Sequence, residues 1–379
     1  MKSKSIKGNS PEEIQSALEQ SLGDGFKPTL AVVFLSVKQD RSAICKILTD
    51  YNITIFGSTT SGEFIDGNVM HESTAILLLD INPSYYKVLF AYYMGKDPKN
   101  VAKEMAKKSL QFFNKPNFLV VSSGLYLDGE QVIRGIEDAA GIESNIWGGR
   151  AADDKMGKST FVFTNNQSSD QGIIILVIDG EKITVKGQAE SGWKAVGTAK
   201  TITKSDGLWI QTLDDQPALD MMIKYMGYKF NKKEDTTPQY DSDVTSPVLL
   251  LRDNGEPILR SQSFINWNER SVMLSGNFEK NGKTRFTLPP DFEVVDEVVK
   301  SCEKIKDTEM PKADAMIIFS CSGRLVELGP MIGKEITGIK DTFNVPIVGF
   351  FTYGEYGRAT NGNNEYHNYT CCWVALKEK

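Results

Sequence analysis

Arg324 and Glu355 are the residues of this chain whose types and positions best suit the binding of a small zwitterion. Each follows an apolar segment of strand length, so each is expected near the end of a strand. Arginine presents a planar set of donors to a carboxylate, and glutamate accepts hydrogen bonds from an ammonium group. Gly323 and Gly354 beside them would let a ligand approach the main chain closely. The pattern favours a ligand site, and the alternative is that Arg324 and Glu355 pair with each other and join two loops.

Three neighbouring residues carry further polar groups. Tyr353 lies in the same turn as Glu355, and His367 precedes the last apolar segment. A histidine could hydrogen-bond a bound acid or ligate haem iron, although a single histidine more often bonds a main-chain carbonyl. Cys321 could act as the nucleophile of a hydrolase if folding brought His367 to it as a base, and the alternative is a packed, buried cysteine. The predicted ligand-binding residues are Arg324, Cys321, Tyr353, Gly354, Glu355 and His367.

The turn that contains Glu355 occurs elsewhere in the chain. Residues 57–63 and 349–355 both read G-x-x-T-x-G-E, and each follows an apolar segment. Residues 148–154 are a weaker copy with an acid again in the last place, and Arg150 and Asp154 are expected to shape a turn there. Repetition of this kind indicates one supersecondary unit that is used several times.

The patterns around these turns follow one order, which is strand, helix, strand, acidic turn, strand. Tight turns after the closing strands lead into alternating segments typical of hairpins, so antiparallel and parallel neighbours are both expected. The predicted fold class is α/β (α+β), with mixed β-sheets and helices built from repeated strand-helix-strand-turn-strand units in two modules. In the first unit, strands are predicted at residues 30–36, 53–56 and 74–79, with a helix after Asp40. In the second unit, strands are predicted at 118–121, 146–147 and 172–178, with a helix at 130–140. In the third unit, strands are predicted at 314–319, 345–348 and 369–376, with a helix at 333–343.

The boundary between the two modules is predicted near Thr212. A polar, β-like segment precedes it, and residues 217–227 follow it with the apolar spacing of a helix. Residues 231–246 are charged and polar, as expected of an exposed loop or linker. The predicted modules are residues 1–212 and 213–379.

Composition excludes several classes of function. With 379 residues the chain is long enough for two or more cores, and a net charge of −6 argues against nucleic acid as a partner. No apolar run approaches the length of a membrane span, and the first residues carry lysines without the apolar core of a secretory signal. Five cysteines without C-x-x-C spacing indicate neither a disulfide framework nor a zinc site. A cytoplasmic location is therefore expected.

Several motifs of the chain, taken together and in this order, resemble the FIST family of intracellular signal-transduction sensor domains found in bacteria and eukaryotes. The matching segments are residues 56–63, 148–154, 213–219, 319–324, 349–355 and 366–370. The resemblance implies a FIST N-terminal module followed by a FIST C-terminal module, and a sensor that binds a small ligand, with amino acids proposed for the family. Some members bind haem and sense nitric oxide for a partner histidine kinase, which implies an alternative role for this chain.

The same resemblance implies a binding protein and not an enzyme. The chain has no P-loop, no G-x-S-x-G and no H-E-x-x-H motif, which agrees with that expectation. It has no kinase, cyclase or methyl-accepting segment either, so its signal is expected to pass to a separate partner such as a histidine kinase. No resident cofactor or metal is expected unless His367 holds haem.

Overall fold

Apolar runs of the sequence form the central strands of the fold. Every residue of β2 (Leu30–Ser36) and of β22 (Ala315–Cys321) is buried, as expected of strands that are covered on both faces. The computed structural model describes residues 1–154, 158–226, 247–252, 256–288, 291, 293–359 and 362–379. The linker predicted at 231–246 lies outside the described residues.

Three six-stranded sheets share one order of strands. The first sheet runs β1 (Lys2–Gly8), β6 (Thr74–Asp80), β2, β3 (Thr54–Thr60), β10 (Val162–Phe163), β11 (Ser168–Ser169). The second runs β7 (Tyr86–Tyr92), β12 (Gly172–Asp179), β8 (Pro116–Ser122), β9 (Ile146–Arg150), β24 (Glu355–Arg358), β25 (Asn364–His367). The third runs β13 (Ile183–Glu190), β26 (Cys371–Glu378), β22, β23 (Ile347–Thr352), β4 (Glu63–Ile65), β5 (Asn68–Met70).

Parallel and antiparallel pairs alternate in the same way in the three sheets. The two central strands are parallel in each sheet, as β2–β3, β8–β9 and β22–β23, and their other neighbours are antiparallel. The fold class predicted from the sequence, α+β with mixed sheets and helices, is therefore confirmed.

Each acidic turn carries the chain from one sheet into another. After β3 of the first sheet, β4 pairs with β23 of the third sheet. After β23, β24 pairs with β9 of the second sheet. After β9, β10 pairs with β3 of the first sheet. The three sheets are thus joined by main-chain hydrogen bonds as well as by side-chain packing.

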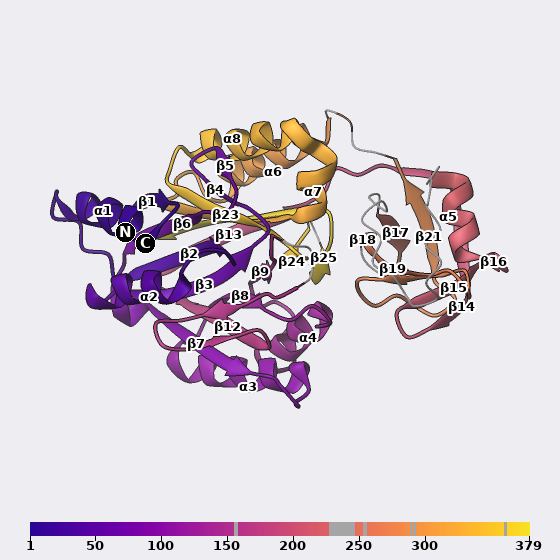
Figure 1. The fold of residues 1–379 in the computed structure, drawn as a ribbon, viewed down its shortest axis with the longest axis horizontal. Helices are drawn as coiled ribbons and strands as arrows, with labels where there is room; N and C mark the ends of the chain where they lie inside the picture. Colours follow the sequence, from indigo (N-terminus) through magenta and orange to yellow (C-terminus); the bar gives the residue numbers. More distant parts are fainter. Residues whose placement is uncertain (155–157, 227–246, 253–255, 289–290, 292, 360–361) are drawn as a thin grey trace.

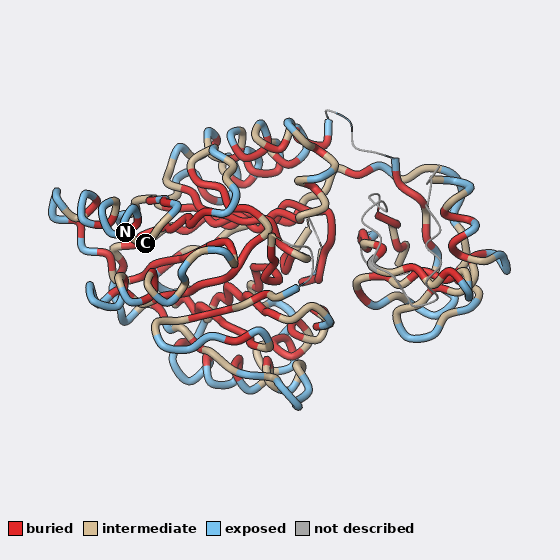
Figure 2. Tube along the Cα trace, in the orientation of Figure 1, coloured by how far each residue is buried: buried red, intermediate tan, exposed pale blue. Residues whose placement is uncertain are grey.

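Helices cover the outer faces of the sheets, and the inner faces pack on one another (Figure 1, Figure 2). The central core contains Phe34, Phe319 and Phe350, whose rings lie 4.5 to 6.1 Å apart between centroids. Several helices begin at a Ser or Asp that accepts a main-chain N–H, which is the usual N-cap. The helices of these three sheets are α1 (Pro11–Leu22), α2 (Arg41–Asp50), α3 (Pro98–Phe112), α4 (Gly129–Ala140), α6 (Glu293–Thr308), α7 (Ser322–Leu328) and α8 (Ile332–Phe343), with 3-10 turns at Pro83–Tyr85 and Gly329–Met331.

The described residues between 195 and 287 form a separate small lobe with a core of its own, which stands to the right of the main body in Figure 1. Its strands are β14 (Ala195–Asp206), β15 (Trp209–Leu213), β16 (Gln216–Pro217), β17 (Val248–Leu251), β18 (Ile258–Arg260), β19 (Gln262–Asn266), β20 (Ser271–Leu274) and β21 (Lys283–Thr287), and its helix is α5 (Ala218–Met226). The lobe lies between β13 and α6 in the chain. The predicted module boundary at residue 212 falls within β15 of this lobe, and the division into two modules stays a prediction. None of the helices in the described part of the chain is both long and apolar enough to cross a bilayer.

Candidate functional site

The turn between β23 and β24 brings Tyr353, Gly354 and Glu355 to a place where strands of the second and third sheets meet. Gly354 has a φ of 141°, a conformation that side chains rarely allow. A Cβ atom at this position would lie 2.1 Å from the hydroxyl oxygen of Tyr366. Only glycine fits this turn, because the ring of Tyr366 fills the space beside it.

Glu355 is fully buried and surrounded by hydroxyl groups. Its carboxyl accepts hydrogen bonds from the hydroxyl of Thr352, from Oγ1 of Thr370 at 2.8 Å and from the main-chain N–H of Thr370 at 3.3 Å. The thiol of Cys321 also contacts it. Burial raises the pKa of Glu355 to about 8, although the hydrogen bonds act in the opposite direction. The group is therefore mostly a neutral acid at pH 7.

The same arrangement occurs around Glu63 in the first acidic turn. Its carboxyl accepts from the hydroxyl of Thr60, from Oγ of Ser73 at 2.8 Å and from the main-chain N–H of Ser73 at 3.3 Å. Burial raises the pKa of Glu63 to about 7. The third acid, Asp154, instead accepts a hydrogen bond from Ser36. Closing the turn is thus one role that Glu63 and Glu355 share.

Arg324 lies in the first turn of α7, fully buried, and its ion pair is with Glu335 of α8. The guanidinium also donates to the carbonyl oxygens of Ser191, at 2.6 Å, and Tyr369, at 3.0 Å. Among the described residues Arg324 therefore forms no ion pair or hydrogen bond with Glu355, and it supports the chain one residue before Thr370. Glu335 is not among the site residues predicted from the sequence. A charged residue on the apolar face of a predicted helix was the signal that could have found it.

His367 lies opposite Glu355 in the β24–β25 pair. Its Nε2 is 3.3 Å from the carbonyl oxygen of Gly357, and because a carbonyl only accepts, this nitrogen carries the proton. Burial, with the charges of Arg260 and Arg252, lowers the pKa of His367 to about 3. A closely packed imidazole that already bonds a carbonyl beside two guanidinium groups does not fit a resident haem.

Cys321 is buried at the end of β22, and burial raises the pKa of its thiol well above the ordinary value, with the charge of Glu355 acting in the same direction. A thiol in these surroundings is a poor nucleophile, because the thiolate is the reactive form. His367 does not contact it in any hydrogen bond of the described residues. Cys371 and Cys372, which are neighbours in β26, pack into different cores.

Arg150 is a direct neighbour of the turn. Its main-chain N–H donates to the carbonyl of Gly354 at 2.7 Å, and its own carbonyl accepts from Tyr353 at 3.3 Å. The guanidinium reaches the hydroxyl of Tyr366, which in turn donates to the carbonyl of Tyr353. The sequence predicts that Arg150 shapes a turn, whereas the structure places its side chain among the predicted site residues.

Charged side chains join this region to the small lobe. Arg260 of the lobe is fully buried, pairs with Glu130 at 3.3 Å and donates to the carbonyl of Tyr366 at 2.5 Å. Arg252 pairs with Glu365 of β25. Residues of β25 are therefore in direct contact with the small lobe.

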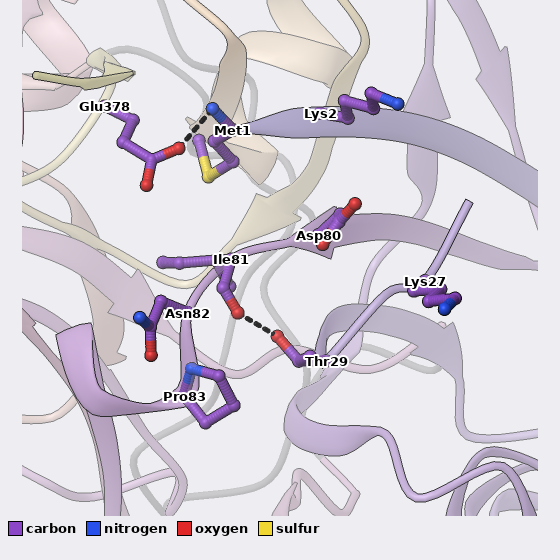
Figure 3. A pocket seen from close by; sticks show the side chains of 9 residues that line it. All are labelled: Met1, Lys2, Lys27, Thr29, Asp80, Ile81, Asn82, Pro83 and Glu378. Atoms are coloured by element: carbon purple, nitrogen blue, oxygen red, sulfur yellow. Dashed lines mark hydrogen bonds and ion pairs between the residues drawn. The ribbon is translucent and has the colours of Figure 1, made fainter. Parts of the chain in front are cut away.

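Two surface cavities lie elsewhere. One, of about 600 Å³, opens beside β1 and β6, where Met1 pairs with Glu378 and Thr29 donates to the carbonyl of Ile81 (Figure 3). The other, of about 400 Å³, lies between the ends of α3, α4 and β13. Neither cavity is lined by a predicted ligand-binding residue. In the described part of the chain, no three His, Cys, Asp or Glu side chains gather as metal ligands would.

Comparison with known families agrees with the resemblance found in the motifs. Residues 29–216 match the FIST N domain, and residues 218–358 match the FIST C domain. No curated protein shows significant similarity to the chain. The two matched regions together cover nearly the whole sequence, and FIST domains are sensory and not catalytic. The chain belongs to the FIST family of signal-transduction sensor domains.

Proposed function

We propose that this sensor binds a small ligand, an amino acid, at the turn formed by residues 353–355. The observation that carries the proposal is the position of this turn. It joins the third sheet to the second, and through β25 it adjoins the charged contacts with the small lobe. A ligand bound here touches parts of the chain that are far apart in sequence, as a sensor requires.

Glu355 supplies the polar group for the ligand's ammonium, and the bound cation favours the charged form of this carboxyl, which is mostly neutral in the unliganded chain. The donors from Thr352 and Thr370 that now surround the carboxyl are hydroxyl groups, which can turn away when a cation replaces them. Tyr353, Gly354 and Cys321 line the same turn, and His367 lies across the strand pair. Arg324 acts as a positioning residue, because it holds the carbonyl of Tyr369 next to Thr370.

The signal passes to a separate protein, for which a histidine kinase is one candidate, and the chain performs no chemical step itself. Displacement of β24 and β25 on ligand binding alters the contacts of Arg252 and Arg260, and so the position of the small lobe. The lobe is then the part that a partner reads in the cytoplasm.

A calorimetric melting scan against the protein amino acids, small organic acids and haemin tests the proposal. Saturation at about 100 times the dissociation constant adds about 2.7 kcal/mol of stability and raises the midpoint by a few degrees. We expect a shift with one class of amino acid. The shift should be lost in Glu355→Gln and kept in Glu63→Gln, which changes the equivalent carboxyl of the first turn.

Absence of a shift with every amino acid would contradict the proposal, as would equal shifts in the two variants. A melting shift with haemin alone, together with a Soret band that His367→Ala removes, would instead support a haem-binding sensor.

A further inference from the structure

Arg150 carries a buried positive charge, and no carboxylate among the residues that the structure describes forms an ion pair with it. Its side chain lies in the interior, and the whole residue is 7% exposed. Two other fully buried guanidinium groups form ion pairs, Arg324 with Glu335 and Arg260 with Glu130. In the part of the chain that the structure describes, no Asp or Glu forms an ion pair with Arg150.

The hydrogen bonds of Arg150 leave part of its donor capacity unused. Nη2 donates to the carbonyl oxygens of Gly124, at 2.5 Å, and Leu125, at 2.9 Å, and Nη1 donates to the hydroxyl of Tyr366 at 3.2 Å. Nε is buried and has no hydrogen-bond partner. A guanidinium has five N–H donors, and a buried charge with only neutral acceptors is costly to keep. An anionic group beside Arg150 would supply the pairing that these neutral acceptors do not.

The position of Arg150 is one where sheets of this kind bind ligands. It ends β9, a parallel neighbour of β8, and the loop that follows β8 leads directly into α4. Ligands of open α/β sheets bind outside the carboxyl ends of parallel strands. Burial acts to lower the pKa of Arg150, but the hydroxyls of Tyr366, Tyr356 and Tyr93 act in the opposite direction, and the net effect is a raised pKa.

We propose that Arg150 binds the carboxylate of a small organic ligand, which supplies the missing ion pair beside Tyr366 and the turn at residues 353–355. Arginine suits this group because its planar donors match the two carboxylate oxygens. The inference rests on the proposed function and deepens it. It names the group by which the ligand is recognised, and it gives this role to Arg150 in place of Arg324, whose donors already meet Glu335 and two carbonyls.

The test compares four probes on the full chain by isothermal titration. They are the amino acid that gives the largest melting shift, its carboxamide, its amino alcohol and inorganic phosphate. The variants are Arg150→Met, Arg150→Lys and the control Arg41→Met, which removes a guanidinium that lies over Phe161 of another region. We expect the wild type and Arg41→Met to bind the amino acid and not the carboxamide or the alcohol. Arg150→Met should bind at least about tenfold more weakly, which corresponds to about 1.4 kcal/mol.

Equal affinity for the acid and its carboxamide, or undiminished binding in Arg150→Met, would overturn the inference. Tight binding of phosphate alone would also overturn the inference, because the site would then recognise an oxyanion that is not a carboxylate. If Arg150→Met does not fold, Arg150→Lys keeps the charge without the planar donors, and its unchanged affinity would equally overturn the inference.

The two proposals can fail separately. If no amino acid shifts the wild type, simple carboxylates without an amino group, such as acetate and succinate, are titrated next. Binding that depends on Arg150 would then support the carboxylate site while the amino-acid proposal fails. No binding of any carboxylate would overturn both.

Discussion

The hydroxyl of Thr370 donates to the carboxyl of Glu355 across 2.8 Å, and this bond ties the β23–β24 turn to the start of β26. The pair Ser73 and Glu63 makes the same bond at the same distance in the first acidic turn. Both acids are buried among hydroxyl donors, and neither has a cationic partner in the ion pairs of the described residues. The contribution of Glu63 and Glu355 to the stability of the fold therefore depends on whether their carboxyl groups are protonated.

The free energy of unfolding is predicted to fall as the pH rises, because of Glu355. Its pKa in the folded chain, about 8, lies above the ordinary value of 4.5, so the stability that it contributes is fully present below pH 4.5 and is lost as pH rises through about 8. Between pH 6.5 and 8, Glu355→Gln should remove part of this fall, at most about 1.4 kcal/mol per pH unit. Urea unfolding at several pH values measures the effect.

One control variant accompanies this measurement. Glu303 is exposed on α6, and Glu303→Gln should leave the pH profile unchanged. His367, whose pKa is lowered to about 3, acts in the opposite direction and only below pH 6.5, where stability is lost as the pH falls. A wild-type profile that rises between pH 6.5 and 8 would contradict a buried, protonated Glu355.

The effects of Arg324 and Glu335 on the free energy of unfolding are predicted to be strongly coupled. Arg324→Met leaves Glu335 buried without a partner and should cost about 3–5 kcal/mol of unfolding free energy. The double variant Arg324→Met with Glu335→Met should recover most of this loss, because it leaves no unpaired charge. Denaturant unfolding of the two single variants and the double variant measures the coupling.

The exposed pair Lys300 and Glu297 gives the matched control for this cycle. Its atoms are 3.1 Å apart on the surface of α6, and Lys300→Met should change stability far less than Arg324→Met, because water screens an exposed pair. A loss in Arg324→Met as small as in this control would show that the buried pair is not formed.

The five cysteines are predicted to be unreactive in the folded chain. All are free and buried, and burial raises the pKa of Cys45 and of Cys302 to about 12. A coloured thiol reagent should detect no rapid reaction in the native protein and five thiols after unfolding. Fast alkylation of Cys321 alone would instead support the hydrolase alternative.

Local features of the fold could be predicted from the sequence, because they depend on neighbouring residues. Apolar runs gave the buried strands, and the motif around Gly354 marked a turn that only glycine permits. The entry of β4 into the sheet of β23 could not be predicted, because it joins residues nearly 300 positions apart through packing. For the same reason the sequence did not reveal that Arg324 meets Glu335, or that Arg150 forms no ion pair with an acid in the described part of the chain.

The insertion of the small lobe was also hidden in the sequence. Its strands have the same apolar alternation as those of the main body, and only their pairing shows that β14 and β21 belong to a separate sheet. The family regions meet at residues 216–218, inside this lobe, so sequence similarity and hydrogen-bonded sheets divide the chain differently.

Hydrogen exchange of the wild-type protein with and without a mixture of the protein amino acids tests most directly whether a ligand binds at the turn. We expect slower exchange in peptides that cover residues 349–358 and 146–152, because a bound amino acid would tie β9 to the β23–β24 turn more firmly. Peptides of β1 and β6, at the far edge of the first sheet, should not change. No protection at the turn, or protection confined to other parts of the chain, would contradict a ligand site there.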